Sequence, residues 1–348
     1  SESVPGGLKR KFTVELNNRI PKDSFKNCLL NAAQQFIVRK KSGTEVKAGF
    51  PWFGTWGRDT FMALPGLTMT TGDLSTALEV IDTMVKRMKD GLFPNTLVDG
   101  EPAYNSADAP LWFIWTLQQY AAYDPGFDIW KKYGKAVKAV LESYREGQSG
   151  MVRMMENGLV HAAQEGSALT WMDAVVDGQP VTRRAGFPVE VNALWYNAVC
   201  QALEWSAGKD QKFNKAWAQL PDLIKESFNE VFWNEEMGYL ADYTDQSFRD
   251  MSVRPSQVIA VAVNHSPLTA EMKKSVLDVI EGELLTTRGL RSLSPKNEAY
   301  KGVYEGSQEK RDRAYHQGTV WPWLLEHFTK GYLDVHRKSG LHQIKRIF

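Results

Sequence analysis

Residues 73–88, DLSTALEVIDTMVKRM, contain the pattern that recurs along most of this chain. Apolar side chains return every three or four positions, at Leu74, Ala77, Leu78, Ile81, Met84, Val85 and Met88. That spacing is the repeat of one face of an α-helix, and Asp is a common residue immediately before a helix begins. The stretch therefore predicts an amphipathic helix that starts after Asp73.

The helical period extends through most of the remaining sequence. Two further apolar stripes span residues 129–144 and 213–231, and the first is followed by Gly147. Other helices are expected near 24–40, 58–70, 108–123, 187–207, 254–264, 269–284 and 317–335. Strand patterns are few and short, near 151–161 and 238–243, and the first indicates a hairpin around Glu156-Asn157-Gly158. The sequence therefore predicts an all-α fold with small β-hairpins.

Short and long connections alternate between these helices. The long ones, rich in Gly, Pro and Trp, cover residues 41–57, 89–107, 161–186 and 285–316. Because loops of that length usually carry function, we expect helical hairpins arranged as a toroid with a site at the loop-rich end. An eleventh helix begins near Ser339, whereas a closed barrel of six hairpins needs twelve. We therefore expect one α/α-barrel domain over 1–348 that lacks its last helix or helices.

The charge balance argues against several classes of partner. The chain has 42 basic and 41 acidic residues among 348, for a net charge of +1. No basic excess is available to attract nucleic acid or an anionic membrane, so a neutral partner is favoured. No apolar run is long enough to span a membrane, and residues 1–10 do not resemble a signal peptide. A cytoplasmic location is the expectation.

Cysteine, histidine and glycine patterns give no sign of a cofactor. Cys28 and Cys200 are interpreted as small buried apolar residues rather than as a disulfide. The six histidines show no metal-ligand spacing, so no metal is expected. The sequence also lacks the glycine-rich motifs that bind nucleotides and the GxSxG motif of serine hydrolases.

Tryptophan is abundant, with twelve residues, and several lie in loops beside polar groups. Trp56 precedes the pair Arg58-Asp59 at a predicted helix start. The flat face of an indole suits the C–H face of a sugar ring, and an Arg-Asp pair can bind neighbouring hydroxyl groups. The alternative is a helix N-terminus that simply favours an acid.

A second candidate is Asp173, in the long loop 161–186 between Trp171-Met172 and Ala174. Apolar neighbours disfavour the charged form of a carboxyl group and raise its pKa, as a general acid requires. A loop Asp is otherwise usually a turn or capping residue. Capping also remains open for Ser106 and Asp108, and Glu190 could be a surface acid favoured by a helix N-terminus.

Seven strings in the sequence, taken together, resemble the C-terminal amylo-α-1,6-glucosidase domain of glycogen debranching enzymes. They are 51–60 (PWFGTWGRDT), 105–108 (NSAD), 170–174 (TWMDA), 188–197 (PVEVNALWYN), 254–257 (RPSQ), 289–295 (GLRSLSP) and 315–323 (YHQGTVWPW). They occur in the family's order over about residues 45–325. The resemblance implies a six-hairpin α/α barrel of the glucoamylase-like kind, without a cofactor.

The resemblance also implies the chemistry. It implies hydrolysis of the α-1,6-linked glucose at a branch point of an α-glucan such as glycogen or limit dextrin, with inversion. The family's general acid corresponds to Asp173, and Arg58-Asp59 would hold the terminal glucose. The remaining residues expected to line the substrate pocket are Trp56, Asn105, Asp108, Trp171, Glu190, Asn192, His316, Gln317 and Trp321.

One part of the family pattern is missing. The family's general base is a Glu in a later loop, which does not occur before Phe348, so we expect the base beyond that residue. Glu165, Glu190 and Glu305 are substitutes without family support. Two alternatives remain at this stage: an inverting glycosidase with the same barrel that acts on another α-glucoside, and a non-catalytic barrel that binds glycans.

Overall fold

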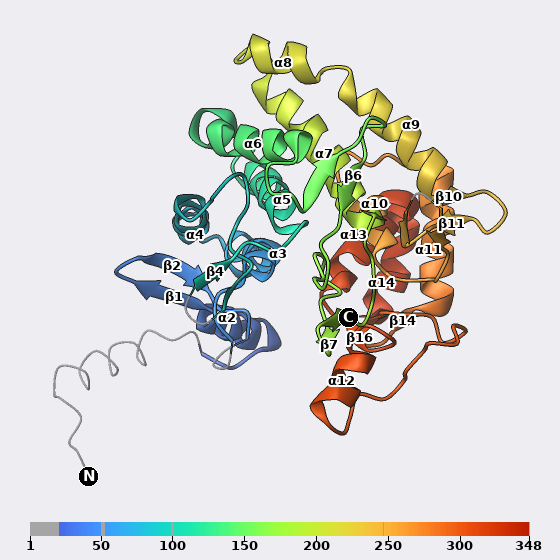
Figure 1. Cartoon of the computed structure of the whole chain (residues 1–348). Helices are drawn as coiled ribbons and strands as arrows, with labels where there is room; N and C mark the ends of the chain where they lie inside the picture. The colour runs from blue at the N-terminus through green and yellow to red at the C-terminus, as the bar shows by residue number, and fades with distance from the viewer. Residues whose placement is uncertain (1–20, 50–52, 99–100, 246, 348) are drawn as a thin grey trace.

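The computed structural model describes residues 21–49, 53–98, 101–245 and 247–347, and within them the chain is mostly helical (Figure 1). The α-helices are α2 (Phe25–Gln35), α3 (Gly57–Leu67), α4 (Leu74–Lys86), α5 (Ala109–Tyr123), α6 (Ile129–Glu146), α7 (Val189–Ser206), α8 (Gln211–Trp217), α9 (Leu220–Phe232), α10 (Gln257–Ala262), α11 (Ala270–Glu283), α12 (Gln308–Tyr315), α13 (Leu324–His336) and α14 (Leu341–Ile347). Two 3₁₀ helices are η1 (Met69–Thr71) and η2 (Arg337–Gly340). The expectations for residues 1–10 and for Pro51-Trp52 fall outside the described residues.

The strands pair as small antiparallel sheets in the connections between helices. Five two-stranded hairpins are β1 (Ile37–Lys40) with β2 (Gly43–Val46), β3 (Thr96–Val98) with β4 (Glu101–Ala103), β5 (Val152–Met154) with β6 (Val160–Ala162), β7 (Val175–Val176) with β8 (Gln179–Pro180), and β10 (Trp233–Asn234) with β11 (Tyr239–Leu240). Two three-stranded sheets combine β9 (Phe187–Pro188), β12 (Tyr243–Thr244) and β13 (Arg249–Asp250), and β14 (Leu285–Thr286), β15 (Gly289–Arg291) and β16 (Val320–Trp321). The predicted hairpin at 151–161 is thus confirmed.

Helix starts follow the capping chemistry that the sequence indicated. The Asp73 carboxylate accepts a hydrogen bond of 3.0 Å from the Thr76 amide at the start of α4. Asp128 does the same for the Lys131 amide of α6, and α6 ends at Gly147 in the left-handed conformation. The apolar stripe of α4 is buried in the core. The predicted helix after Asp73 is therefore confirmed.

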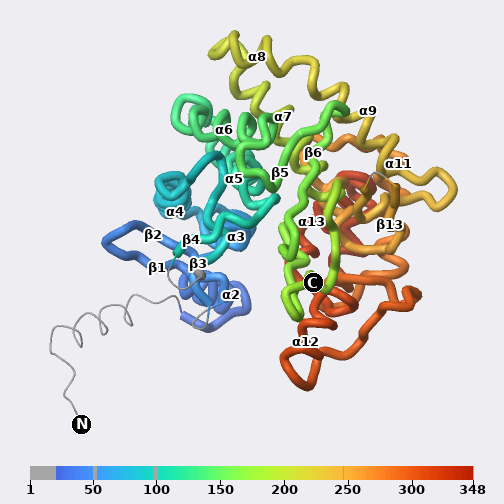
Figure 2. The backbone as a smooth tube through the Cα atoms, in the orientation of Figure 1, coloured from blue at the N-terminus to red at the C-terminus, as the bar shows by residue number. Residues whose placement is uncertain are grey.

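Five helices form an inner row, and others cover its outer side. α3 contacts α5, α5 contacts α7, α7 contacts α10, and α10 contacts α13. On the outside, α6 packs on α5 and α7, α9 packs on α7, and α11 packs on α10 and α13. Figure 2 shows the backbone curving from α3, past α5 and α7, to α13. The two ends of this curved row, α3 and α13, face a common cavity.

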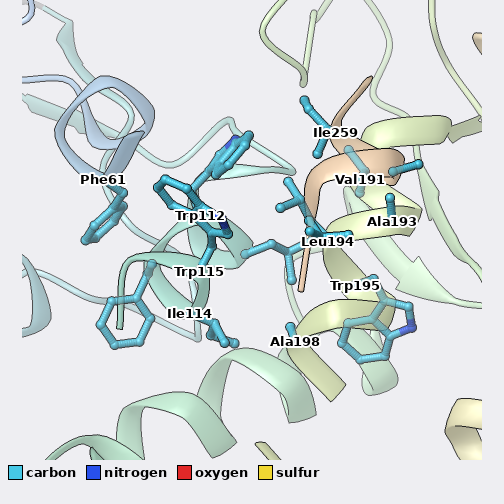
Figure 3. Close-up of a cluster of buried hydrophobic side chains, with 14 of the residues drawn as sticks. Phe61, Trp112, Ile114, Trp115, Val191, Ala193, Leu194, Trp195, Ala198 and Ile259 are labelled. Carbon is cyan, nitrogen blue, oxygen red and sulfur yellow. The ribbon is translucent and has the colours of Figure 1, made fainter. Parts of the chain in front are cut away.

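The inner helices α5, α7 and α10 are buried on most sides, whereas α3 and α13 each have one side on the cavity. Trp112 of α5 and Trp195 of α7 are each at most 1% exposed, and Ile259 of α10 is fully buried (Figure 3). A helix that is apolar all round is expected where it is surrounded by other helices. The inner row is thus the core of the molecule, and it provides a rigid support for the loops at its ends.

Several sequence expectations need correction. The expected helix over 24–40 ends at Gln35, because Ile37 and Val38 belong to strand β1. The stripe over 213–231 is divided between α8 and α9, since Pro221 lies at the first turn of a new helix. The loop 285–316 contains helix α12. Cys28 is exposed rather than buried, and Cys200 is half-buried.

The described residues also bear on membrane insertion and metal binding. No helix in the described part of the chain is long and apolar enough to cross a membrane. Within the same residues, no group of three or more His, Cys, Asp and Glu side chains is placed to hold a metal ion.

Candidate active site

The cavity at the ends of the inner row has a volume of about 1540 Å³. Its wall on one side comes from α3 and its wall on the other from α13, and α12 and the loops beside it close a third side. Asp173 lines this cavity with 29% of its side chain exposed. Asp173 is carried by the long connection between β6 and β9, so its position depends on contacts with other elements.

Arg58 joins Asp173 to a fully buried carboxylate. Its Nε lies 2.8 Å and 2.9 Å from the two carboxylate oxygens of Asp108, and its Nη1 donates to Asp173 Oδ2 at 3.1 Å. The Ser106 hydroxyl donates to Asp108 at 2.6 Å and accepts the Ala109 amide at 3.1 Å. Ser106 therefore caps α5, as one sequence interpretation allowed, and Asp108 is a buried partner of Arg58.

This arrangement favours a protonated Asp173. Burial raises the pKa of Asp173, the positive charge of Arg58 lowers it, and the negative charge of Asp108 raises it. The net direction is upward, because burial is the largest influence and the Asp108 carboxylate offsets part of the Arg58 charge. A carboxyl group with a raised pKa beside a cavity is suited to donate a proton near neutral pH.

Asp59 is the second acid close to this point. It follows Arg58 in the first turn of α3, lines the cavity and is half-buried. Burial is the largest influence on its pKa and raises it, while Arg58 acts in the opposite direction. α3 can begin here because the Gly57 amide donates to the Asn95 carbonyl at 2.9 Å, and a Cβ on Gly57 would lie 2.5 Å from the Pro94 oxygen.

Aromatic rings enclose the acid from the α13 side. Trp171 meets His316 and Trp321 edge-on, with centroid distances of 5.4 Å and 5.7 Å, and all three line the cavity. The indole N–H of Trp171 donates to Ser256 Oγ at 3.0 Å, which fixes the ring. His316 stacks on Trp321 at an interplanar angle of 10°.

His316 is a neutral imidazole in an unusual position. It is 1% exposed, and neither ring nitrogen has a hydrogen-bond partner within the described residues. Burial, followed by the charges of Arg254 and Arg58, lowers its pKa to about 3. The ring therefore offers one donor and one acceptor at the cavity wall, which is the combination a hydroxyl group can satisfy.

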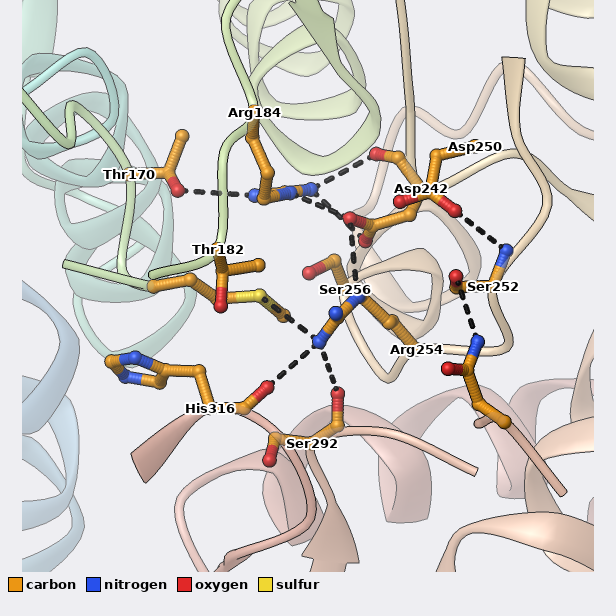
Figure 4. Close-up of polar contacts among 12 residues, drawn as sticks. Thr170, Thr182, Arg184, Asp242, Asp250, Ser252, Arg254, Ser256, Ser292 and His316 are labelled. Atoms are coloured by element: carbon orange, nitrogen blue, oxygen red, sulfur yellow. Dashed lines mark hydrogen bonds and ion pairs between the residues drawn. The ribbon is translucent and has the colours of Figure 1, made fainter. Parts of the chain in front are cut away.

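A buried ionic network lies behind this wall (Figure 4). Arg184 binds both carboxylate oxygens of Glu190, donates to Asp242 at 2.7 Å, and donates to the Thr170 hydroxyl at 3.1 Å. Asp242 is also 3.8 Å from Arg254. Two cations and two acids are thus held together out of solvent, and the network reaches the segment that carries Asp173 through Thr170.

Arg254 links that network to the aromatic wall. Its Nη1 donates to the His316 carbonyl at 2.7 Å and to the Ser292 carbonyl at 3.1 Å, and its Nη2 donates to Gln317 Oε1 at 2.8 Å. The same Nη1 lies 3.9 Å from the sulfur of Met172. Gln317 is consequently a support of the wall and is not among the residues that line the cavity.

The structure brings together about half of the residues predicted to form the site. The predicted residues that line the cavity are Trp56, Arg58, Asp59, Trp171, Asp173, His316 and Trp321. Those that do not line it are Asn105, Asp108, Glu190, Asn192 and Gln317.

The predicted residues outside the cavity have other partners. Glu190 is fully buried against Arg184, and Asn192 Oδ1 accepts the Val160 amide at 2.7 Å. Of the substitute bases, Glu305 is exposed, and Glu165 lines a separate cavity of about 530 Å³. None of the three substitute bases lines the cavity that contains Asp173.

Sequence reasoning missed several residues of the site. Tyr304 and Tyr315 line the cavity, and so does Glu326 of α13. Tyr315 was quoted as part of a matching string without a role, whereas Tyr304 lies in a long loop in which no aromatic residue was singled out. Arg184 was missed because its two acidic partners come from different segments, and only the folded chain brings them together.

The comparisons with known proteins identify a family and a fold. The family model described as amylo-alpha-1,6-glucosidase matches residues 31–348. The glycogen debranching enzyme of Saccharomyces cerevisiae is 23% identical over 445 aligned residues, which cover 96% of this chain. The chain spans only 29% of the length of that relative.

Three solved structures share the fold. An uncharacterized conserved protein from Thermus thermophilus has a TM-score of 0.66 and 12% identity, over 92% of this chain and 89% of its own. A GH63 mannosylglycerate hydrolase from the same organism, in complex with Tris, has a TM-score of 0.64 and 11% identity, over 91% and 90%. A wild-type glycosidase has a TM-score of 0.62 and 12% identity, over 99% and 84%.

At such low identities the three structures establish the fold alone, whereas the family model covers nearly the whole sequence. The match over residues 31–348 and the relationship to the yeast enzyme agree on the same class of glycoside hydrolase. The chain belongs to the amylo-α-1,6-glucosidase family.

Proposed function

We propose that this chain carries an α-1,6-glucosidase site that releases the single glucose attached at a branch point of a neutral α-glucan. The observation that supports this most directly is the Asp173 carboxyl group, half-buried at the cavity, with a raised pKa and a hydrogen bond from Arg58. A protonated acid that opens onto an aromatic-lined cavity can protonate a glycosidic oxygen.

The residues beside Asp173 have separate roles, either to orient the acid or to bind the sugar. Each of the three guanidinium nitrogens of Arg58 donates to a protein group, at Asp108, Asp173 and Ser106. Arg58 therefore orients the acid, and Asp59, which lines the cavity, accepts hydrogen bonds from sugar hydroxyls. Trp56 and Trp171 supply ring faces for the pyranose, and the neutral His316 can both donate to and accept from a hydroxyl.

Inversion requires a second carboxylate about 6.5–9.5 Å from the acid, which activates a water on the opposite face of the sugar. The family resemblance assigns that base to a Glu in a loop later than the 315–323 string. We propose that this Glu takes the proton from the attacking water while Asp173 gives its proton to the leaving oxygen. The two carboxyl groups then end each turnover with their protonation states exchanged.

The same proposal covers the barrel. We propose that α3, α5, α7, α10 and α13 are five inner helices of a six-hairpin α/α toroid that forms one domain. The observation that supports this is the cavity between α3 and α13, where a sixth inner helix would close the ring. Met62 and Leu67 of α3 and Leu333 of α13 are among the residues that line it.

The test is glucose release from a limit dextrin trimmed to single α-1,6-linked glucose residues. We expect Asp173→Asn to lower turnover by about two to four orders of magnitude with little effect on binding, since the amide keeps the shape and cannot donate the proton. The assay is run with this chain and with any longer natural form of it. Asp334→Asn, a change to an exposed acid of α13 that also lines the cavity, is the matched control.

Unchanged turnover in Asp173→Asn would remove Asp173 from the role of acid. Release of glucose from another α-glucoside, with no release from the trimmed dextrin, would contradict the α-1,6 assignment. It would favour an inverting glycosidase with the same barrel and another substrate. Tight binding of the dextrin without hydrolysis by any form would favour the glycan-binding barrel.

A further inference from the structure

A row of aromatic rings continues from the acid toward the outside of the cavity. The centroid of Trp321 is 5.7 Å from that of Trp171, Tyr315 is 4.9 Å from Trp321, and Tyr304 is 5.6 Å from Tyr315. All four side chains line the cavity. Trp171 is 6% exposed and Tyr304 is 45% exposed, so the row leads from the buried acid to the surface.

The opposite end of the site is closed. Arg58 is 5% exposed, and behind it Asp108 is completely buried. A sugar held between Arg58, Asp59 and the acid can therefore extend no further in that direction. The remainder of a bound glucan must leave on the open side, where Tyr315 and Tyr304 lie.

Polar side chains accompany the outer rings. Gln308, Arg311 and Asp312 of α12 line the same cavity as Tyr304. Ring faces surrounded by amide, guanidinium and carboxylate groups suit a neutral sugar, whose C–H face packs on the ring while its hydroxyls bind the polar groups. Gln308 donates to Asp312 at 2.7 Å and accepts from Arg311 at 2.7 Å, so the three polar groups are held in place beside the ring.

The outer wall is fastened to the rest of the site. Arg311 Nη1 donates to the Gly306 carbonyl, which ties α12 to the loop that carries Tyr304, and the Lys301 amide donates to the Gln317 carbonyl at 2.6 Å. Arg313 forms an ion pair of 3.7 Å with Asp177 in the loop after Asp173. Tyr304 is thus presented on a supported segment rather than on a free loop.

We propose that Tyr304, Tyr315 and Trp321 form a platform for the α-glucan chain that carries the branch, on the leaving-group side of the scissile bond. This inference depends on the proposed function, because it assumes that the glucose to be released occupies the closed end. The platform makes the enzyme prefer branches on longer chains, since each additional sugar in contact with a ring adds binding energy.

The experiment measures dissociation constants by calorimetry, so it does not require turnover. The probes are isomaltose and a maltopentaose that carries one α-1,6-linked glucose, and the proteins are the wild type, Tyr304→Ala and Tyr304→Phe. We expect the wild type to bind the branched maltopentaose more tightly than isomaltose. Tyr304→Ala should weaken binding of the longer probe by about 3- to 10-fold, as loss of one aromatic contact predicts, and leave isomaltose within about twofold.

The controls separate stacking from structural damage. Tyr304→Phe keeps the ring and should restore most of the affinity for the longer probe. Tyr123→Ala is the matched control, because Tyr123 is 48% exposed and does not line the cavity. Equal binding of the longer probe by the wild type and Tyr304→Ala would overturn the platform, as would equal wild-type affinities for the two probes.

A different binding result would contradict the proposed function and leave the platform intact. A chain that discriminates chain length at Tyr304, but binds linear maltopentaose as tightly as the branched probe, would keep the platform and lose the α-1,6 assignment.

Discussion

Replacing Glu190 by Gln tests whether this acid supports the fold or contacts the substrate. Both of its carboxylate oxygens accept hydrogen bonds from Arg184, and the side chain is fully buried. The amide of Gln would keep one acceptor and point its NH₂ group at the guanidinium. Breaking a buried ion pair from one side costs about 3–5 kcal/mol.

We expect the lower end of that range. Asp242 remains 2.7 Å from Arg184 and still balances part of its charge. The entropy of unfolding of a 348-residue chain is about 0.7 kcal/mol/K, so a loss of about 3 kcal/mol lowers the melting temperature by about 4 °C. Burial raises the pKa of Glu190 and Arg184 lowers it, with a net rise.

The assay combines scanning calorimetry with a titration of isomaltose. Glu190→Gln should melt earlier and keep its affinity for the sugar within about threefold. Glu326→Gln is the matched control, because Glu326 is exposed and lines the cavity, and it should leave the melting temperature within about 1 °C. An unchanged melting temperature together with lost sugar binding would refute the structural role and return Glu190 to the substrate pocket.

Two further predictions concern charge balance and backbone fit. Asp108→Asn removes a negative charge that raises the pKa of Asp173, so Asp173 should lose its proton at lower pH. The alkaline limb of the pH–rate profile should therefore move to lower pH. A profile that does not move would contradict this charge balance. Gly289→Ala should destabilise the protein by about 2 kcal/mol or more in denaturant unfolding, since φ is +150° and the new Cβ would lie 2.6 Å from the backbone of Trp321. Gly282→Ala, in open space on α11, should instead be neutral or stabilising by up to about 1 kcal/mol, and equal losses in both variants would contradict the argument.

The apolar period of the sequence was sufficient to predict most of the helices. It failed for α12, whose sequence QEKRDRAY has no apolar stripe and buries only Ala314. That helix is stabilised locally, since Ser307 accepts the Lys310 amide at its start and Arg313 pairs with Glu309 at 2.8 Å. The apolar period also did not reveal the break between α8 and α9, because the apolar spacing continues across Ala218 and Gln219.

The candidate site was predicted best where several of its side chains come from one short segment. Arg58 and Asp59 are adjacent, and Trp171 and Asp173 are two residues apart, so the string alone brings the groups together. The roles of Asp108 and Glu190 depend on which cation lies opposite, and that cation is 50 or 6 positions away in sequence. A single sequence contains no signal for such pairings, so both acids were assigned to the pocket when their partners are buried arginines.

The position of Asp173 follows from how the preceding residues are held. The Leu169 carbonyl accepts the Ala107 amide at 2.7 Å, Thr170 accepts from Arg184, and Trp171 donates to Ser256. Three consecutive residues are thus held by three separate parts of the chain, and Asp173 itself is held by Arg58.

A loop alone has little rigidity, and a general acid must be held within a fraction of an ångström of its target. The two buried arginines meet this need from different sides: Arg184 holds Thr170 while its charge is balanced by Glu190 and Asp242, and Arg58 holds Asp173 while its charge is balanced by Asp108. Because each cation has its own buried anion, neither forces Asp173 to ionise. The loop therefore has a fixed geometry while the pKa of Asp173 stays raised, as the proposed general acid requires.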